Sequence, residues 1–207
     1  MDREETKHML LSIADEETLK SNLSFTAFFI ALYENFVDLT VDRVEGFYCN
    51  GFSTDETGKV TMTQSPEYSK RILQREDNLG KRVGVLRATL FWLLEAEAIT
   101  QDDIDCFYEI REQRNRFTHE LTNCLLNGLT EDEVKKLFDL FRIYKKIDKW
   151  WINEIEIPCS ADEIPQDYDP DGVQSVISGL FDIMVDVLFR GNSKEHKELI
   201  EQYFNAS

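Results

Sequence analysis

The sequence predicts an all-α protein: an antiparallel bundle of five or more helices with one small β-hairpin insertion. The 207 residues include only 9 glycines and 4 prolines, which favours long helices. Apolar residues recur at helical spacing in several segments, and capping residues separate these segments. Hydrophobic residues make up 42% of the chain, enough for a sizeable core. The length suits one domain, so we expect residues 1–207 to form a single helical domain.

The first half of the chain predicts two helices around the hairpin. A long helix is expected over residues 23–44, where phenylalanine and leucine recur with a helical period. Residues 46–64 predict the hairpin insertion, because the turn-forming run 54–58 lies between two strand-like segments. Ser65 and Pro66 then begin another helix, with proline at its first position.

Two further helices are predicted on either side of residue 100. Asp77 or Asn78 is expected to cap a helix that runs through the apolar segment up to residue 99. Thr100 and Asp103 have the spacing of a capping box. The helix that they open is predicted to extend to about Asn127, where a glycine follows.

The last third of the chain predicts helices on both sides of an acidic loop. Thr130 and Glu133 open a helix that runs toward Trp150. Residues 154–171 contain seven acidic residues and three prolines, which is typical of an exposed loop. Residues 172–207 are expected to form the C-terminal helices.

The charge balance excludes some function classes. Lys and Arg total 23 against 40 Asp and Glu, so the formal charge is −17. Such a surface repels polyanions, which argues against a general nucleic-acid coat protein or a membrane-surface binder. Basic residues still gather in two clusters: Lys70, Arg71, Arg75, Lys81, Arg82 and Arg87, and then Lys135, Lys136, Arg142, Lys145, Lys146 and Lys149. We interpret both as outer faces of amphipathic helices, with a path for RNA as the alternative.

The sequence also indicates the cellular setting. No apolar run approaches the roughly 20 residues of a membrane span; the best one covers only Ala27–Tyr33. The polar, acidic N-terminus is unlike a signal peptide. The four cysteines are scattered, without the spacing of zinc ligands. We therefore expect a cytoplasmic protein with no membrane partner, no metal and no other cofactor.

One polar stripe on the helix after Thr100 differs from the solvated faces elsewhere. With a rotation of about 100° per residue, five polar residues share it: Arg111, Arg114, Asn115, Thr118 and His119. The adjacent core stripe is predicted to hold Cys106, Ile110, Phe117, Leu121 and Cys124. The side expected to face water holds Glu109, Gln113, Arg116 and Glu120.

The groups on this polar stripe suit the cleavage of RNA. An imidazole can take a proton from a hydroxyl group. A guanidinium can hold two phosphate oxygens and stabilise charge that builds up on phosphorus, and an amide can orient either group. Together they can cleave a phosphodiester without a metal, with the 2′-hydroxyl of the substrate as nucleophile. One helix supplies one histidine, so the second proton transfer needs another histidine, a water molecule or a second copy of the motif.

The run from Arg114 through Asn115 to His119 resembles a known motif. It matches the R-(N/D/H)-x-x-x-H signature of the HEPN superfamily, and the helix order over residues 22–150 is similar to that family's. Many members are metal-independent, all-α endoribonucleases that dimerise so that two motif copies face one cleft. The resemblance implies that Arg114 and His119 are catalytic, that Asn115 supports them, and that the chain forms a homodimer. We assign Arg111 and Thr118 to substrate binding, with a salt bridge as the alternative role of Arg111.

The resemblance leaves the biological role open between several alternatives. Family members act as toxins, in phage defence or in RNA processing, so an antitoxin or another regulatory protein is an expected partner. Some toxins of the family carry tyrosine two residues after the histidine as a modification site, but this chain has Leu121 there. The alternative function is a non-catalytic HEPN-like interaction module whose acidic surface docks a basic partner. A third hypothesis is an all-α structural subunit unrelated to the family.

Overall fold

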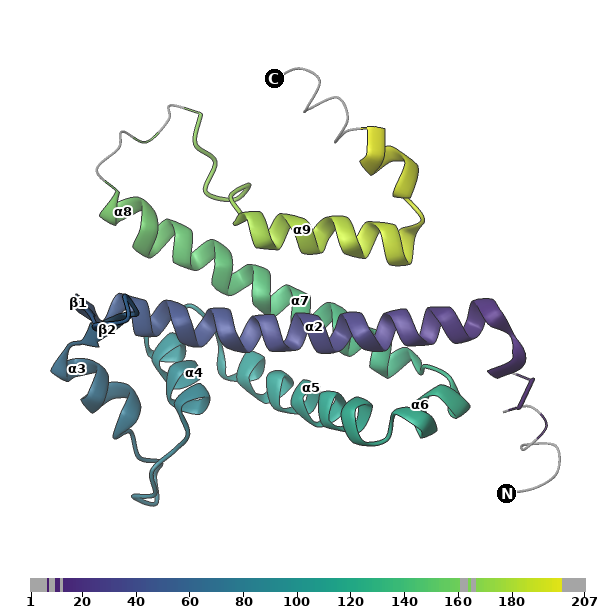
Figure 1. Cartoon of the computed structure of the whole chain (residues 1–207), viewed down its shortest axis with the longest axis horizontal. Coiled ribbons are helices and arrows are strands. Elements are labelled where there is room, and N and C mark those ends of the chain that lie inside the picture. Colours follow the sequence, from purple (N-terminus) through teal and green to yellow (C-terminus); the bar gives the residue numbers. More distant parts are fainter. Residues whose placement is uncertain (1–6, 8–9, 12, 161–163, 165–166, 199–207) are drawn as a thin grey trace. The chain divides into compact units, whose positions relative to one another are not determined.

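The computed structural model describes residues 7, 10–11, 13–160, 164 and 167–198 (Figure 1). Within this part the protein is all-α apart from one hairpin of two strands, which confirms the predicted fold class. The helices are α2 (Glu16–Phe47), α3 (Pro66–Tyr68), α4 (Val85–Glu95), α5 (Gln101–His119), α6 (Leu121–Asn127), α7 (Glu131–Trp151), α8 (Ile157–Cys159) and α9 (Val176–Val185). Three π-helical segments extend them: η1 (Ser69–Leu73), η2 (Ile152–Glu156) and η3 (Asp186–Arg190). None of the helices described is both long and apolar enough to cross a bilayer.

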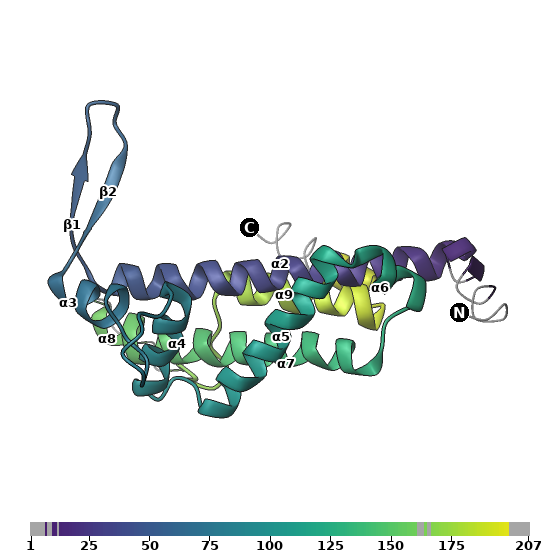
Figure 2. The same ribbon diagram turned by 90° about the horizontal axis from the view of Figure 1, so that it is seen from below.

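The hairpin pairs β1 (Cys49–Thr54) with β2 (Val60–Gln64) and extends away from the end of α2 (Figure 2). The strands are antiparallel, with Phe52 opposite Met62 and an irregularity near the start of β1. Asp55 closes the turn, because its carboxylate accepts hydrogen bonds from the backbone N–H groups of Thr57 at 2.8 Å and Lys59 at 3.1 Å. The insertion predicted over residues 46–64 is thus confirmed.

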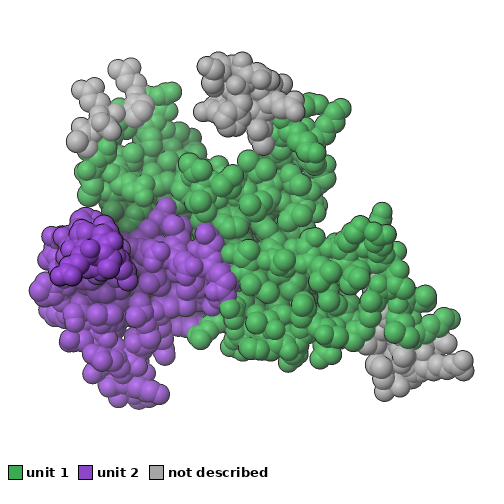
Figure 3. Space-filling view, viewed as in Figure 1, with its two compact units in different colours: residues 1–32, 109–207 green, residues 33–108 purple. Residues whose placement is uncertain are grey.

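The chain divides into two compact units (Figure 3). Unit 1 comprises residues 1–32 and 109–207, and unit 2 comprises residues 33–108. The boundaries fall within α2 and within α5. The assignment of residues 1–207 to a single domain stays a prediction.

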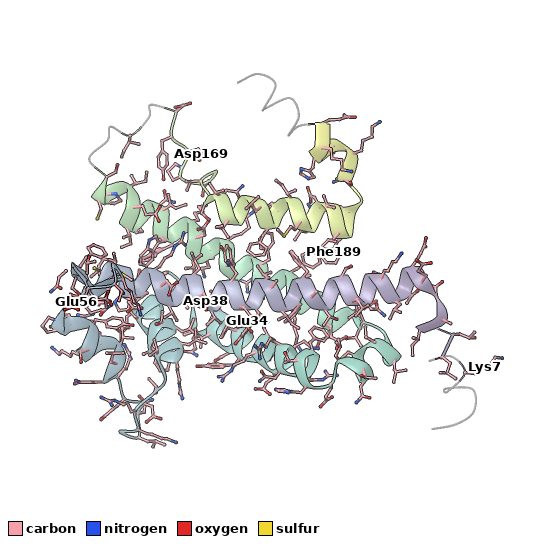
Figure 4. The ribbon with its side chains drawn as sticks, viewed as in Figure 1. Lys7, Glu34, Asp38, Glu56, Asp169 and Phe189 are labelled. Atoms are coloured by element: carbon pink, nitrogen blue, oxygen red, sulfur yellow. The ribbon has the colours of Figure 1, made fainter. Side chains whose placement is uncertain are left out.

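Aromatic side chains dominate the core of unit 1. Phe117 of α5 lies edge-on to Phe25 and Phe29 of α2, with ring centroids 6.1 and 5.1 Å apart. Phe189 of η3 contacts Phe25 at 5.8 Å and Phe28 at 5.7 Å (Figure 4). These contacts join α2, α5 and η3 around one apolar centre.

Unit 2 has a second aromatic cluster. Tyr33 and Phe36 of α2 both stack on Phe107 of α5, at 5.5 and 5.0 Å. The indole N–H of Trp92 donates a hydrogen bond to the hydroxyl oxygen of Tyr48 at 2.8 Å. This bond ties α4 to the segment that leads into the hairpin.

Three of the predicted helix starts are confirmed, whereas the helix predicted over residues 23–44 begins earlier, at Glu16, and ends at Phe47. Pro66 stands at the start of α3 after the extended Ser65. Thr100 and Asp103 bond to each other in the capping arrangement at the start of α5. At α7 the capping box is complete, because the backbone N–H of Thr130 donates to a Glu133 carboxylate oxygen and the Glu133 N–H donates to the Thr130 hydroxyl.

The helix predicted from residue 77 or 78 begins only at Val85, so that prediction was wrong. The carboxylate of Asp77 accepts hydrogen bonds from the backbone N–H groups of Leu79 at 2.9 Å and Lys81 at 3.0 Å. Aspartate can close a turn as readily as it caps a helix, and here it closes a turn.

The helix predicted over residues 101–127 is interrupted at Glu120, whose φ of −124° and ψ of 27° leave the helical region. α5 therefore ends at His119, and α6 follows as a separate helix. Neither glycine nor proline marks this break in the sequence. Its consequence is that the motif histidine lies at the carboxyl end of its helix.

The acidic loop predicted over residues 154–171 begins later than expected. η2 and α8 carry the helix on to Cys159, so its first six residues are helical. Residues 161–163 and 165–166 of this loop lie outside the described residues. The C-terminal helices predicted over residues 172–207 are seen as α9, η3 and a helical turn at 193–198, and residues 199–207 lie outside the described part.

Candidate functional site

The buried face of α5 fixes how its polar stripe is presented. Ile110 and Phe117 are fully buried, and Cys124 of α6 is buried too, as predicted. Cys106 is only half-buried. Leu121 is 37% exposed, so its assignment to the core stripe was wrong. The break at Glu120 explains this, because the helical rotation that relates Leu121 to Ile110 does not continue through it.

The side of α5 expected to face water contains one buried residue. Gln113 is 2% exposed, and its amide N–H donates to a carboxylate oxygen of Glu133 at 2.8 Å. Arg116, which remains exposed, donates to the amide oxygen of Gln113 at 3.3 Å. The capping carboxylate of α7 thus satisfies a buried amide of α5, and the prediction for Gln113 was wrong. Glu109 and Glu120 are exposed as predicted.

Two of the predicted catalytic residues are in direct contact. Arg114 and Asn115 are both half-buried, and the Arg114 guanidinium donates to the Asn115 amide oxygen at 3.4 Å. An amide that accepts from a guanidinium restricts the orientations of both groups. The pair therefore presents one cation with a restricted geometry on the polar stripe.

The hydroxyl of Thr118 is engaged within the helix. It donates to the backbone carbonyl oxygen of Arg114, four residues earlier, at 3.0 Å. The Thr118 side chain is exposed, and its oxygen lone pairs stay available as acceptors. The Thr118 hydroxyl can therefore accept a hydrogen bond from a substrate hydroxyl, but it already donates its own proton to the Arg114 carbonyl oxygen.

Arg111 and His119 are exposed on the same stripe. Neither makes a side-chain hydrogen bond or an ion pair with another residue of the described chain. The salt bridge considered for Arg111 is thus not formed among these residues. Hydrogen bonds link Arg114 with Asn115 and with Thr118, whereas no hydrogen bond among the described residues links the His119 ring to any of the three.

The other polar candidates have structural roles. The carboxylate of Asp103 is buried and accepts from the backbone N–H and the hydroxyl of Thr100, at 3.0 and 2.9 Å. Trp151 is buried, and its ring lies edge-on to Trp150 at 6.1 Å. Within the described ranges, no three His, Cys, Asp or Glu side chains gather in a way that suits a metal ion.

The two basic clusters differ in their surroundings. On α7, Lys135 pairs with Asp139 at 2.9 Å, and Lys145 pairs with Asp182 of α9 at 2.8 Å. Lys149 also pairs with Asp171. This cluster is thus largely neutralised, as expected for the outer face of an amphipathic helix. Four members of the other cluster, Lys70, Arg71, Arg75 and Arg87, instead line hollows on unit 2.

Sequence reasoning noted the basic residues of unit 2 but missed the aromatic residues beside them. Phe47 and Phe91 lie far from each other in the sequence, and each lines a hollow together with an arginine. No local spacing signals that these rings lie beside arginines, because that depends on how the end of α2, η1 and α4 come together. The only signal available was the excess of basic residues at 70–87 in an acidic chain.

Comparison with known proteins adds no assignment. No protein-family model matches the chain, and no curated protein or solved structure matches it.

Proposed function

We propose that the protein is a metal-independent endoribonuclease of the HEPN type, with Arg114, Asn115 and His119 as its catalytic residues. The observation that carries this proposal is the contact between the Arg114 guanidinium and the Asn115 amide, on the same polar stripe as an exposed imidazole. A cation for phosphate and a group for proton transfer are the two requirements of metal-free RNA cleavage.

The proposed reaction uses the RNA itself as nucleophile. His119 takes the proton of a ribose 2′-hydroxyl, and the resulting oxyanion attacks the adjacent phosphorus. Arg114 stabilises the charge that develops on the phosphoryl oxygens, while Asn115 holds the guanidinium in place. The bond from phosphorus to the 5′-oxygen then breaks. The products are a 2′,3′-cyclic phosphate and a 5′-hydroxyl group, whose oxygen receives a proton from an acid.

The proposal includes a homodimer, since a single protomer offers one imidazole on the stripe. In a dimer the second His119 can supply the proton for the leaving oxygen while the first acts as base. Arg111, exposed and without an ion-pair partner among the described residues, can hold a neighbouring phosphate. A toxin or phage-defence role in the cytoplasm, under the control of an antitoxin or another regulatory protein, is the biological setting that we propose.

The test is RNA cleavage by the purified protein in EDTA, with His119→Ala and Arg114→Ala as variants. We expect cleavage by the parent protein and loss of it in both variants. Lys135→Ala, on the outer face of α7, is a matched control that should cleave like the parent, because its side chain is 75% exposed and far in sequence from the motif. Cleavage that persists in both motif variants would refute the assignment of Arg114 and His119 as catalytic residues.

A second candidate function is a non-catalytic interaction module. It is favoured by an exposed apolar stripe on α9, where Val176, Leu180 and Met184 are 81, 46 and 44% exposed. Apolar side chains at this spacing on a charged protein are typical of a surface that docks a partner. A stable complex with a basic partner that survives both motif substitutions, together with no nuclease activity in any condition, would favour this function.

A further inference from the structure

Three adjoining hollows on unit 2 form one groove. The first, of about 570 Å³, is lined by residues that include Phe47, Arg71 and Trp92. The second, of about 590 Å³, shares Arg71 with the first and reaches Arg75. The third, of about 230 Å³, shares Arg75 with the second and ends at Arg87. We call this surface, over α3, η1 and α4, the basic groove.

The basic groove carries an excess of positive charge in an acidic protein. Residues 65–95 contain six basic and four acidic residues, whereas the whole chain has a formal charge of −17. Lys70 and Arg87, which line the groove, make no ion pair with any other described residue. A groove that keeps free cations on a surface of this net charge is suited to an anionic ligand.

Two of the four acidic residues are already satisfied by the protein. The carboxylate of Glu95 accepts two hydrogen bonds from the Arg75 guanidinium, at 3.2 and 2.5 Å, and this contact lowers the pKa of Glu95. Asp77 is held by the backbone N–H groups of its own turn, which lower its pKa. By contrast, Glu67 and Arg71 are 3.6 Å apart and both about half exposed, so a ligand can displace this weak pair.

Aromatic rings lie beside the cations. Phe47 is 46% exposed and packs against Trp92, with ring centroids 5.4 Å apart. Trp92 is itself held by its hydrogen bond to Tyr48. Two guanidinium groups lie over the Phe91 ring, that of Arg75 at 5.2 Å and that of Arg87 at 5.3 Å from its centroid. An exposed ring that packs against a second aromatic side chain, next to basic side chains, can stack a nucleobase whose phosphates meet those basic side chains.

We infer that the basic groove binds single-stranded RNA, with a base stacked on Phe47 and the flanking phosphates on Lys70 and Arg71. A phosphorylated peptide would use the cations but not the exposed ring, so the combination favours a nucleic acid. The choice of RNA over DNA rests on the proposed function. The binding itself does not, because every groove residue named here lies in unit 2, whereas the motif residues lie in unit 1.

The experiment measures binding apart from cleavage. Full-length His119→Ala protein in EDTA is titrated into a fluorescein-labelled uridine oligonucleotide, and fluorescence anisotropy gives the Kd over a range of salt concentrations. The groove variants are the double variant Lys70→Glu/Arg71→Glu, then Phe47→Ala and Phe47→Tyr. Lys135→Glu, a charge reversal at an exposed position of α7, is the control. Far-UV circular dichroism establishes that each variant is folded.

We expect the double charge reversal to raise the Kd about tenfold or more and to reduce the dependence of the Kd on salt, since each lost phosphate contact lowers the slope by about 0.7 for single strands. Phe47→Ala should raise the Kd at least about fivefold, and Phe47→Tyr should keep the parent value because it keeps the ring. Lys135→Glu should change the Kd less than about twofold.

Three outcomes would overturn the inference: no binding by the parent, groove variants that bind like the parent, or displacement of the RNA by a phosphoserine peptide of equal charge at equal concentration. Because cleavage is measured separately, the two proposals fail separately. Binding through the basic groove with no cleavage in any condition would refute the endoribonuclease and leave the groove as a binding site.

Discussion

The polar stripe of α5 and the basic groove of unit 2 both present arginine side chains, but they hold them differently. On α5, Arg111 and His119 are exposed and form no side-chain hydrogen bond or ion pair with other described residues. In the groove, Arg75 is fixed between Glu95 and Phe91, and Arg87 lies against the same ring. The stripe thus has the guanidinium and imidazole groups that RNA cleavage needs, but one protomer does not complete the site. The groove has a hollow surface and positive charge but no imidazole.

This difference indicates that the stripe carries out catalysis and that the groove binds the substrate. Catalysis requires groups that are positioned against the reacting atoms, and on the stripe the side chains of Arg114 and Asn115 restrict each other. Binding requires a surface that is formed before the ligand arrives, and the groove has one. The two regions should therefore respond to substitution in separate kinetic parameters.

The largest expected effect is on turnover. His119→Ala should lower kcat by about 100-fold or more, because the proton acceptor is lost, and should leave KM nearly unchanged. The double variant Lys70→Glu/Arg71→Glu should raise KM and leave kcat within about twofold of the parent value. Steady-state cleavage of a labelled RNA in EDTA gives both parameters. If the groove variant lowers kcat as strongly as the motif variant, the assignment of catalysis to the stripe and of binding to the groove is wrong.

The next effect concerns what holds the stripe in place. Phe117→Ala should lower the free energy of unfolding by about 3–5 kcal/mol, since it removes a fully buried ring from between Phe25 and Phe29. Leu121→Ala is the control, because Leu121 is partly exposed and should contribute about 1 kcal/mol or less. Urea unfolding followed by circular dichroism measures both. A loss below about 1 kcal/mol for Phe117→Ala would contradict the role of this ring as the anchor of α5.

Parts of this picture are predictable from the sequence, and the reason lies in the range of the interactions. The starts of α3, α5 and α7 follow from short capping patterns such as Thr130 and Glu133, whose partners are three residues apart. The buried face of α5 follows from the period of Ile110 and Phe117. Local signals of this kind are complete within one helical turn or two.

The rest could not be predicted, because it depends on contacts between distant segments or on ambiguous local signals. Asp77 can cap a helix or close a turn, and nothing near it decides between them. The burial of Gln113 depends on Glu133, twenty residues later. The motif residues were found from their spacing alone, whereas Phe47, at the end of α2, lines the basic groove because it packs against Trp92 of α4.

A smaller effect is expected from the polar link between α5 and α7. Gln113→Ala should lower the free energy of unfolding by about 1–3 kcal/mol, because it leaves the buried Glu133 carboxylate without one of its donors. Glu109→Ala, on the exposed face of α5, should change the stability by less than about 0.5 kcal/mol. Equal stabilities of the two variants would mean that the Gln113 contact contributes nothing measurable.

The smallest effect concerns the groove and pH. The hydrogen bonds from Arg75 lower the pKa of Glu95, so the pair stabilises the folded protein above the ordinary carboxyl pKa, and this stabilisation is lost as the pH falls through the lowered value. Glu95 is 52% exposed, so the loss should be about 1 kcal/mol or less. The free energy of unfolding, measured at neutral and at acidic pH, should fall less in Glu95→Gln than in the parent. An identical fall in the two proteins would show that the pair does not couple stability to pH.

The measurement that tests the proposed chemistry most directly compares one oligonucleotide sequence made as RNA and as DNA, each incubated with the parent protein in EDTA. If the substrate's 2′-hydroxyl is the nucleophile, the RNA is cut to products ending in a 2′,3′-cyclic phosphate, the DNA stays intact, and His119→Ala cuts neither. Cleavage of the DNA, or RNA products that end only in a 3′-hydroxyl, would contradict the account.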